Sequence, residues 1–422
     1  MSLEQKYIEL YATHTGQICR GFAPQVNAGR RALLDDFLAS GAPDSKGEKY
    51  RYSDMRRIYG RDLSLPSIEA PIPGREGVMT LGNGVFADGE PLVVRADGVI
   101  TGSLRAASVD FPEFVLGRLN SVATNLSDGL TALNGAMMPD GIFVYVPCGV
   151  DGGTIDVELL YDTVHEDDLV FSRMLVVLEE GAEARLQARY RGRAGNHLVV
   201  NHVTEAILGR GAKLQMGEAY DFGEGNDAFA VSYSSVAEDG TLDRVFVSIG
   251  GEAVRLGYHC DLAHTGAQSS LYGLFMGAGR ERIDIYSEVD HLAGGCSSYQ
   301  MVKGVADEQS TGAFTGRIYV APGADGTSAL QQSRNMTLTP TSRIVSVPQL
   351  EIYAQDVQCS HGASVGQLDR EAIYYMQQRG IDEVEAKALQ MSGFVNDIID
   401  RCGDGSFVEE ICNMASGRIR RV

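Results

Sequence analysis

Cys359 and His361 are the two side chains whose types and spacing best suit metal chemistry. They lie two residues apart in the stretch DVQCSHGASVGQ, residues 356–367. Thiolate and imidazole are the ligands that soft and borderline metals prefer. In an extended segment, residues i and i+2 point to the same face and lie about 6.5 Å apart at the α-carbon. Because a tetrahedral site needs about four ligands, the motif predicts a half-site that another element or subunit must complete.

The same pair also has an ordinary structural interpretation. Cysteine is among the most buried residue types and packs as a small hydrophobe. A histidine that precedes a helix can hydrogen-bond the first helical turn. On residue statistics alone, this interpretation of Cys359 and His361 is the more frequent one.

Three further groups of residues are weaker candidates for a metal site. His197 and His202 fall in one strand-like run at an odd separation, which predicts opposite faces of a sheet and structural roles. The second group is His259, Cys260 and His264, and the third is Asp290, His291 and Cys296. Adjacent residues of a strand point to opposite faces, which makes a shared metal site at His259 and Cys260 less favourable. The third group is an equally weak candidate.

The composition argues against several functional classes. The 422 residues are 44% hydrophobic and carry a formal net charge of −20, which would repel a nucleic acid or an anionic membrane surface. No stretch approaches the roughly 18 consecutive apolar residues of a membrane span, and the N-terminal residues lack the pattern of a signal peptide. Seven scattered cysteines without a CxxC pair argue against a disulfide framework. We therefore expect a cytoplasmic protein.

Motifs of enzymatic catalysis are also missing from the sequence. There is no GxxxxGK[ST] phosphate loop, so any ATP hydrolysis would come from a partner. There is no compact carboxylate pair of the glycosidase type. We expect a protein that is not an enzyme. A β-helical carbohydrate-active enzyme is the alternative, because β-helices often carry acidic sites along one face, and a purely structural homodimer is a third class.

Residues 141–363 have the pattern of a stacked β-structure. Short alternating runs such as TIDVELLY and RIDIYSEVDH are separated by Gly, Asn and Asp. These separating residues recur at an interval of roughly 13 to 16 residues, which is typical of stacked repeats. We predict a parallel β-solenoid, with an antiparallel sandwich as the structural alternative. The repeat starts are Gly181, Gly195, Gly211, Asn226, Gly240, Ala253, Gly266, Arg280, Gly294 and Gln309.

The residues before the solenoid divide into two regions. Residues 1–70 read as helical, and the apolar positions Leu33, Leu34, Phe37 and Leu38 precede the stop signal Gly41. Residues 71–140 form a mixed linker segment that leads into the core. The proline-rich stretch SLPSIEAPIPGREG at their junction predicts a linker or turn.

Residues 364–422 predict a helical hairpin. A capping box at Ser364 and Gln367 predicts the start of the first helix. Asp382 predicts the N-cap of the second helix, whose apolar stripe is Ala386, Leu389, Phe394 and Ile398. Such a hairpin could cover the open end of the solenoid, receive a partner, or do both.

These segments resemble the SufD family of the SUF iron-sulfur cluster assembly system. PQLEIYAQDVQCSHGASVGQLDREAIYYMQQRGI, residues 348–381, is similar to the family pattern PxLEIxADDVxCSHGATxGxLD and its following helix. ALNGAMMPDGIFVYVPCGV and TGAFTGRIYVAPGADGTSALQQSRNMTLTP match more weakly in the same order. The sequence departs from the family at Gln355, where an acidic residue is usual, and at Cys148, where lysine is common. The Cys-Ser-His step is intact, and the N-terminal helices resemble SufD rather than its paralogue SufB.

The resemblance implies a right-handed parallel β-helix with helical ends and a non-enzymatic scaffold role in the SufB–SufC–SufD complex. It implies pairing with a SufB paralogue and docking of the SufC ATPase on the C-terminal helices. It favours His361, and Cys359 secondarily, as part of a metal or cluster half-site shared across the subunit interface. We expect no cofactor in the isolated chain, an iron-sulfur cluster held transiently in the complex, and a homodimer as one form of the isolated chain.

Overall fold

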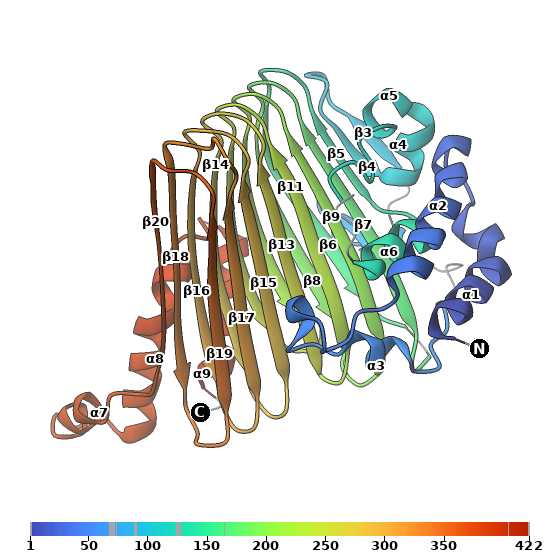
Figure 1. The fold of residues 1–422 in the computed structure, drawn as a ribbon. Coiled ribbons are helices and arrows are strands. Elements are labelled where there is room, and N and C mark those ends of the chain that lie inside the picture. The colour runs from blue at the N-terminus through green and yellow to red at the C-terminus, as the bar shows by residue number, and fades with distance from the viewer. Residues whose placement is uncertain are drawn as a thin grey trace.

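The centre of the molecule is a parallel β-solenoid of about eight turns with helices at both ends of the chain (Figure 1). The computed structural model describes residues 2–66, 72, 74–87, 91–123, 128–163, 165–403 and 405–420. The predicted mainly-β solenoid is therefore confirmed. The antiparallel sandwich is wrong, because successive strands of each sheet in the repeat pair in parallel.

Two ten-stranded sheets form the walls of the solenoid. In spatial order, the first sheet contains β2 (Val85–Phe86), β1 (Met79–Gly82), β6 (Asp151–Tyr161), β8 (Glu183–Gly192), β10 (Lys213–Asp221), β12 (Thr241–Ile249), β14 (Gln268–Gly277), β16 (Ser297–Ala306), β18 (Thr327–Thr337) and β20 (Val357–Gly366). The second sheet contains β3 (Leu92–Val94), β4 (Ile100–Ser103), β5 (Ile142–Val146), β7 (Leu169–Leu178), β9 (Val199–Leu208), β11 (Asp227–Val236), β13 (Ala253–Leu262), β15 (Arg282–His291), β17 (Thr311–Val320) and β19 (Arg343–Ile352).

The chain alternates between the two sheets from β6 onward, so one coil contains one strand of each sheet. The interval predicted from the sequence is therefore one strand plus one turn, or half a coil.

Glycines make the turns possible, because Gly181, Gly211 and Gly266 adopt φ values of 65°, 64° and 73°. A residue with a Cβ is strained in this left-handed region, whereas glycine enters it readily.

The core lies between the two sheets, where alternate residues of each strand point inward. Ala184, Leu186, Ala188 and Tyr190 of β8, for example, are all buried in the main hydrophobic cluster. Their counterparts one coil further on, in β10, are paired in exact register, as with Leu186 and Met216. Register therefore places each residue of β8 directly over its equivalent on β10.

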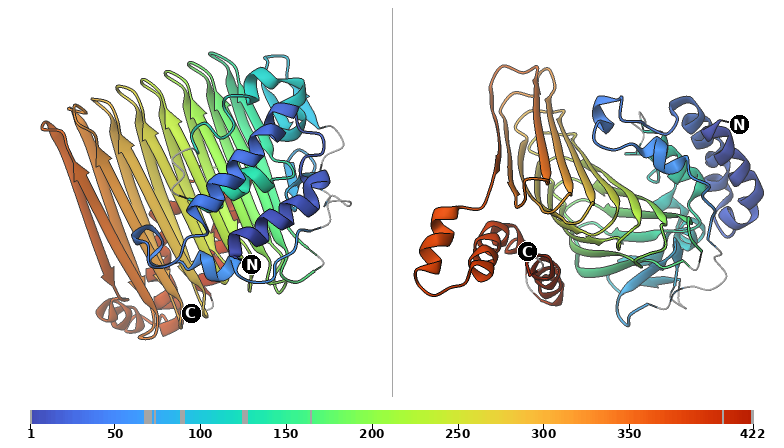
Figure 2. Two further views of the ribbon diagram at one scale, coloured as in Figure 1. Left: turned by 45° about the vertical axis from the view of Figure 1, so that its right-hand side comes forward. Right: turned by 90° about the horizontal axis from the view of Figure 1, so that it is seen from below.

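Helices near the N-terminus cover the outer face of the second sheet at its early strands (Figures 1 and 2). They are α1 (Leu3–Ile18), α2 (Pro24–Ser40), the 3-10 helix η1 (Glu48–Tyr50), α3 (Met55–Tyr59), α4 (Leu104–Asp110), α5 (Pro112–Val115) and α6 (Gly129–Met137). Leu34 and Phe37 of α2 are buried, and Gly41 caps that helix as predicted, while Leu38 is exposed. Part of the predicted proline-rich linker, residues 67–71 and 73, lies outside the described residues.

Two of the three helices near the C-terminus, α8 and α9, pack on the outer face of the first sheet, on the opposite side of the solenoid, and α7 projects away from the sheet beside α8 (Figure 2). The three helices are α7 (Arg370–Gln377), α8 (Glu383–Ile399) and α9 (Ser406–Ile419). Met391 and Ile398 of α8 and Phe407 of α9 contact the outward side chains of β10, β12, β14 and β16. The helices therefore cover a face of the sheet rather than the end of the solenoid.

Two predictions for this region need correction. The predicted capping box is wrong: Ser364 lies inside β20, which pairs with β18 as far as Gly366, and the N-cap of α7 is Asp369. The predicted hairpin has a third helix, α9. Asp382 is confirmed as the N-cap of α8, and Ala386 and Ile398 are buried. Leu389 is exposed, and Met391 and Val395 are buried instead.

Candidate metal half-site at the open end of the solenoid

The last coil leaves one end of the solenoid open. β20 pairs with β18 and β19 pairs with β17, and neither has a second strand neighbour within the described residues. We call these two unpaired edges the open end. Much of β20 is exposed, and the exposed side chains at the open end include Ile352, Tyr353 and Val365.

Cys359 and His361 both lie on β20, on the face that continues the interior of the solenoid. Cys359 is in register with Ala329, and His361 is in register with Gln331, both of which are buried interior residues of β18. The same-face arrangement predicted from the spacing is therefore present. The two residues differ in environment, because Cys359 packs against the small apolar cluster around Ile318 whereas His361 is exposed.

The two side chains do not form a complete metal site by themselves. Burial raises the pKa of the Cys359 thiol, which disfavours the thiolate that a metal requires. Within the described part of the chain, no group of three or more His, Cys, Asp or Glu side chains is arranged to hold a metal ion. The half-site therefore needs ligands from outside this part of the chain and remains a prediction.

Several buried polar atoms of β18 and β19 lack hydrogen-bond partners within the described part of the chain. Gln331 and Asn335 of β18 are almost fully buried, and Gln331 Oε1, Asn335 Oδ1 and the Ser346 Oγ of β19 have no hydrogen-bond partner among the described residues. Buried polar atoms are normally paired. Buried polar atoms without partners among the described residues also occur in earlier coils, for example at His291 and Gln300, so the coils next to the open end share this feature with the rest of the solenoid.

His202 is a structural residue, as predicted, but His197 is not part of the same strand. His202 lies inside the solenoid within 2.9 Å of Ser172 Oγ and 2.8 Å of Thr204 Oγ1. Burial and the Arg173 guanidinium lower its pKa to about 3, so the ring is neutral. His197 lies in the turn before β9 with a φ of 50°, so the prediction of two faces of one strand is wrong for His197.

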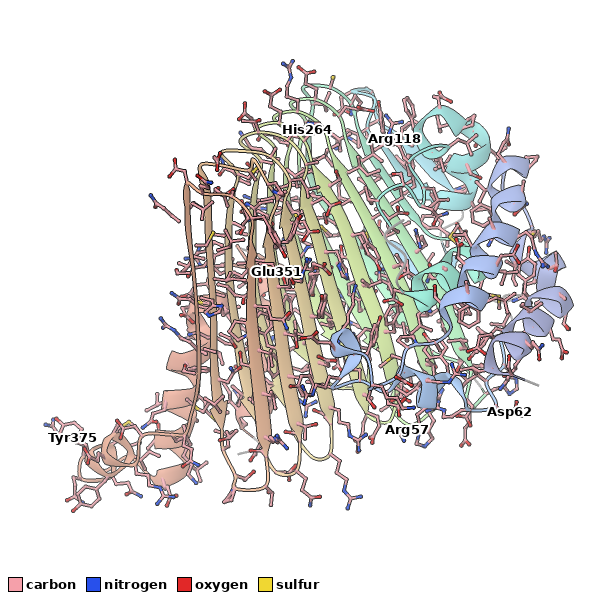
Figure 3. The ribbon with its side chains drawn as sticks, in the orientation of Figure 1. Arg57, Asp62, Arg118, His264, Glu351 and Tyr375 are labelled. Atoms are coloured by element: carbon pink, nitrogen blue, oxygen red, sulfur yellow. The ribbon has the colours of Figure 1, made fainter. Side chains whose placement is uncertain are left out.

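The second candidate group is divided between the interior and the exterior of the solenoid. Cys260 points inward, where burial raises its pKa to about 12. His259 lies on the outer face of the second sheet, between the rings of Tyr233 and Tyr286. His264 is an exposed turn residue at the rim (Figure 3). These three residues do not form one site.

The third candidate group is divided in the same way. His291 points inward, and its Nε2 lies 2.8 Å from Ser298 Oγ. Burial lowers its pKa to about 4. Asp290 points outward, and the thiol of Cys296 is buried and donates to the His264 carbonyl at 3.2 Å. Alternation along β15 separates Asp290 from His291, so the group has no common centre.

The outer face of the second sheet carries an ionic network that the sequence analysis missed. His259 Nδ1 lies 3.1 Å from a Glu288 oxygen, and Arg317 contacts Glu288 at 2.6 Å and Asp290 at 3.2 Å. Arg317 also binds both oxygens of Glu351, at 2.9 Å each, and Glu351 lies on the open sheet face (Figure 3). The network borders a cavity of about 320 Å³. In the sequence, these residues are related only by their spacing of about one coil, which places them on neighbouring strands of one sheet.

The charges within this network shift the pKa values of Glu288 and Asp290, the two carboxyls of β15, in opposite directions. Although burial opposes ionisation, the hydrogen bond from His259 and the cations Lys49 and Arg317 lower the pKa of Glu288 to about 2. Burial and the Glu288 charge raise the pKa of Asp290 to about 7. Burial and Lys49 lower the pKa of His259 to about 4, so a neutral imidazole donates to an ionised Glu288. Because Arg317 binds both carboxyls, we interpret the network as a structural ion cluster.

The C-terminal helices have exposed apolar side chains, and hydrogen bonds attach α8 and α9 to the first sheet. Tyr374 and Tyr375 of α7 and Val384 and Leu389 of α8 are each at least half exposed, and Tyr375 lies at the outer extremity of the molecule (Figure 3). Lys303 of β16 fixes α8 through the Phe394 carbonyl at 2.7 Å, and Glu410 fixes α9 through Arg189 at 2.9 Å.

Comparisons with known proteins agree with this architecture. Residues 161–394 match a family described as SUF system FeS cluster assembly, SufBD core domain, and residues 1–77 and 75–153 match the SufBD protein N-terminal region. The chain is 25% identical to the chloroplastic protein ABCI7 of Arabidopsis thaliana, over 92% of this chain and 85% of that protein. It is 30% identical to the iron-sulfur cluster assembly protein SufD of Escherichia coli, over 43% of each chain.

A third relative is an iron-sulfur cluster assembly SufBD family protein of Synechocystis, 27% identical over 66% of this chain and 63% of that protein. The match thus spans less than two thirds of the Synechocystis protein and less than half of the Escherichia coli protein. Among the helices that the structure describes, none is long and apolar enough to cross a membrane.

Proposed function

Since this chain belongs to the SufBD family and is similar to SufD, a protein of iron-sulfur cluster assembly, we propose that it is a non-enzymatic scaffold subunit of the SUF system. In this proposal it pairs with a SufB-type paralogue and docks a SufC-type ATPase. The cluster is its cargo. A cytoplasmic location is part of the same proposal.

The open end is the observation that carries the proposal. A sheet edge with unpaired N–H and C=O groups is a template for pairing with another chain. Here two ten-residue edges, β19 and β20, lie side by side and are not covered by the described helices. A second solenoid of similar width could extend both sheets at once, which supports a SufB-type paralogue as the occupant and a second copy of this chain as the alternative in isolation.

The location of His361 supports a shared cluster site at this junction. An imidazole on the exposed inner face of β20 would face the first coil of a partner solenoid. Iron can bind imidazole nitrogen and thiolate sulfur. His361, with Cys359 beside it, would supply part of the ligand set, and the paralogue would supply the rest.

The C-terminal helices support the ATPase contact. The inner sides of α8 and α9 pack on the first sheet, whereas Tyr374 and Tyr375 of α7 and Val384 and Leu389 of α8 are exposed. Exposed apolar and aromatic groups on an anchored helical platform are typical of protein interaction surfaces.

Co-expression tests the proposed function. This chain would be tagged and produced with a SufB-type and a SufC-type chain of the same source, then purified without oxygen. We expect both partners to co-purify and the complex to contain iron and sulfide, while the chain alone contains neither. Recovery of this chain alone in repeated purifications, with both partners well expressed, would contradict the proposal.

A further inference from the structure

His361 ends a row of interior side chains whose last two members before it are glutamines. In register along the first sheet, the row runs through Leu186, Met216, Arg244, Leu271, Gln300, Gln331 and His361. Gln300 and Gln331 are 1% and 0% exposed. A buried amide costs folding free energy unless its polar atoms are paired. Two successive glutamines directly before the proposed ligand therefore need an explanation.

The Gln331 amide is held from one side only. Its Nε2 donates to Gln300 Oε1 at 3.1 Å, toward the preceding strand β16. Its Oε1, attached to the same carbon, is buried and has no partner among the described residues. Since the nitrogen is engaged toward β16, the oxygen is left for the opposite side, where β20 is the adjacent strand and His361 is the residue in register.

The solenoid is shaped around this amide. A Cβ placed on Gly316 of β17 would lie 2.2 Å from Gln331 Nε2 and 2.7 Å from its Cδ. Gly316 has no positive φ that would otherwise require glycine. A side chain at this position would displace the amide, so its absence leaves Gln331 the room to hold its orientation.

We propose that Gln331 is a positioning residue for His361: its Oε1 accepts the N–H of one ring nitrogen and thereby directs the lone pair of the other nitrogen toward the open end. A neutral imidazole carries one donor and one acceptor nitrogen. A hydrogen bond to the donor fixes which nitrogen can bind a metal, as partners of metal-bound histidines commonly do. This inference rests on the proposed function, because it concerns the orientation of the half-site.

The hydrogen bond between Gln300 and Gln331 bears on which polar atom Gln331 presents to His361. A glutamine has a donor and an acceptor at the same end, so an unrestrained amide could present either group to His361. In the structure Gln331 Nε2 donates to Gln300 Oε1, which leaves Gln331 Oε1 for His361, and Gln300 Nε2 is likewise buried without a partner among the described residues. Only that orientation suits the N–H of a neutral imidazole whose second nitrogen remains unprotonated.

Nitrogen NMR of the full chain labelled at histidine tests the inference without a cluster. The His361 signals would be assigned by their loss in His361→Ala, and the tautomer ratio would be read from the two ring nitrogens at a pH where the ring is neutral. We expect one tautomer to dominate in the wild type. In Gln331→Met, which keeps the length but removes both polar atoms, the ratio should move toward that of a free imidazole.

Gln332→Met is the matched control, because Gln332 is the next residue of β18, points to the opposite face and accepts a hydrogen bond from the exposed Arg334. It should leave the His361 ratio unchanged. An unchanged ratio in Gln331→Met would overturn the inference. Should that variant fail to fold, Gln300→Leu decides the question, because it frees the amide orientation and should also reduce the preference.

A second readout separates this inference from the proposed function. In the co-expressed complex, Gln331→Met should reduce iron affinity about tenfold, within the range known for partners of metal-bound histidines. A shift of the tautomer ratio with normal iron content in His361→Ala would leave the positioning contact intact and refute the cluster role. The reverse result, a loss of iron in His361→Ala without any effect of Gln331→Met, would refute the positioning role alone.

Discussion

Cys359 and His361 lie on the same face of β20 but differ in burial. Cys359 packs against the cluster around Ile318, whereas His361 is exposed. The shared face makes both residues available to one site. The difference in burial indicates that the thiol serves packing first and that the imidazole is free for a partner.

Substitution of the cysteine should therefore have a limited effect. Cys359→Ser should lower the free energy of unfolding by about 1 kcal/mol, as expected for a polar group placed in a half-buried apolar position. Iron content of the co-expressed complex should fall less than in His361→Ala. Denaturant unfolding and anaerobic iron analysis provide the two measurements. An equal loss of iron in both variants would instead make the Cys359 thiol a true ligand.

Charges introduced at the open end should disrupt subunit pairing. Tyr353→Asp combined with Val365→Asp should weaken association with the paralogue at least tenfold, because each charge would have to be buried in the new interface. Sedimentation of the purified chains would give the affinity. Val109→Asp on α4 is the control, since Val109 is equally exposed but distant from β19 and β20. Equal affinities for both proteins would contradict pairing through the open end.

Substitutions on the outer side of the C-terminal helices should affect a different partner. Val384→Asp and Leu389→Asp replace exposed side chains, so the stability of the chain should change by less than about 0.5 kcal/mol. Binding of the ATPase should weaken, while pairing with the paralogue stays normal. Pull-down of each partner separately distinguishes the two surfaces. Unchanged ATPase binding in both variants would mean that α8 only covers the sheet.

Asp290 should make the stability of the chain depend on pH. Burial and Glu288 raise the pKa of Asp290 to about 7 in the folded chain, whereas an unfolded aspartate titrates near 4. The folded state therefore holds this proton more tightly, and the Asp290 contribution to stability falls as pH rises from about 4 to 7.

Asp290→Asn replaces the titratable carboxyl with an amide that stays neutral across this pH range. Its free energy of unfolding should exceed that of the wild type by about 1 to 2 kcal/mol at pH 8, and the difference should shrink toward pH 5. Glu288 is present in both proteins, so its opposite dependence largely cancels in the comparison. Denaturant unfolding between pH 5 and pH 8 measures the difference, and a constant value across this range would refute the assigned pKa.

The repeat could be predicted because its signals are local. Each turn needs glycine or a similar residue at a left-handed position, as at Gly181 and Gly211, and each strand needs alternating burial. Local signals also misled, since the capping pattern at Ser364 is overridden by pairing of β20 with β18. The exposure of Leu389 depends on which side of α8 meets the sheet, and periodicity alone does not determine that side.

The candidate site could be predicted only in part. The same-face relationship of Cys359 and His361 follows from their spacing alone. Their position on the last strand does not, because it depends on where the stacking ends. The contact between Gln300 and Gln331, and the network around Glu288 and Arg317, join residues about 30 positions apart in sequence. Such contacts need the register of the coils, which a single sequence does not provide.

The cluster content of the His361→Ala complex shows whether His361 is a ligand of the shared site. His264→Ala is the matched control, because His264 is an exposed turn residue at the rim, away from β20. Both variants would be co-expressed with the paralogue and the ATPase, purified anaerobically and checked for normal assembly before iron and sulfide are measured per complex. We expect His264→Ala to keep the wild-type content and His361→Ala to lose most of it, because a ligand of the shared site is missing. Wild-type iron and sulfide in the assembled His361→Ala complex would contradict this role.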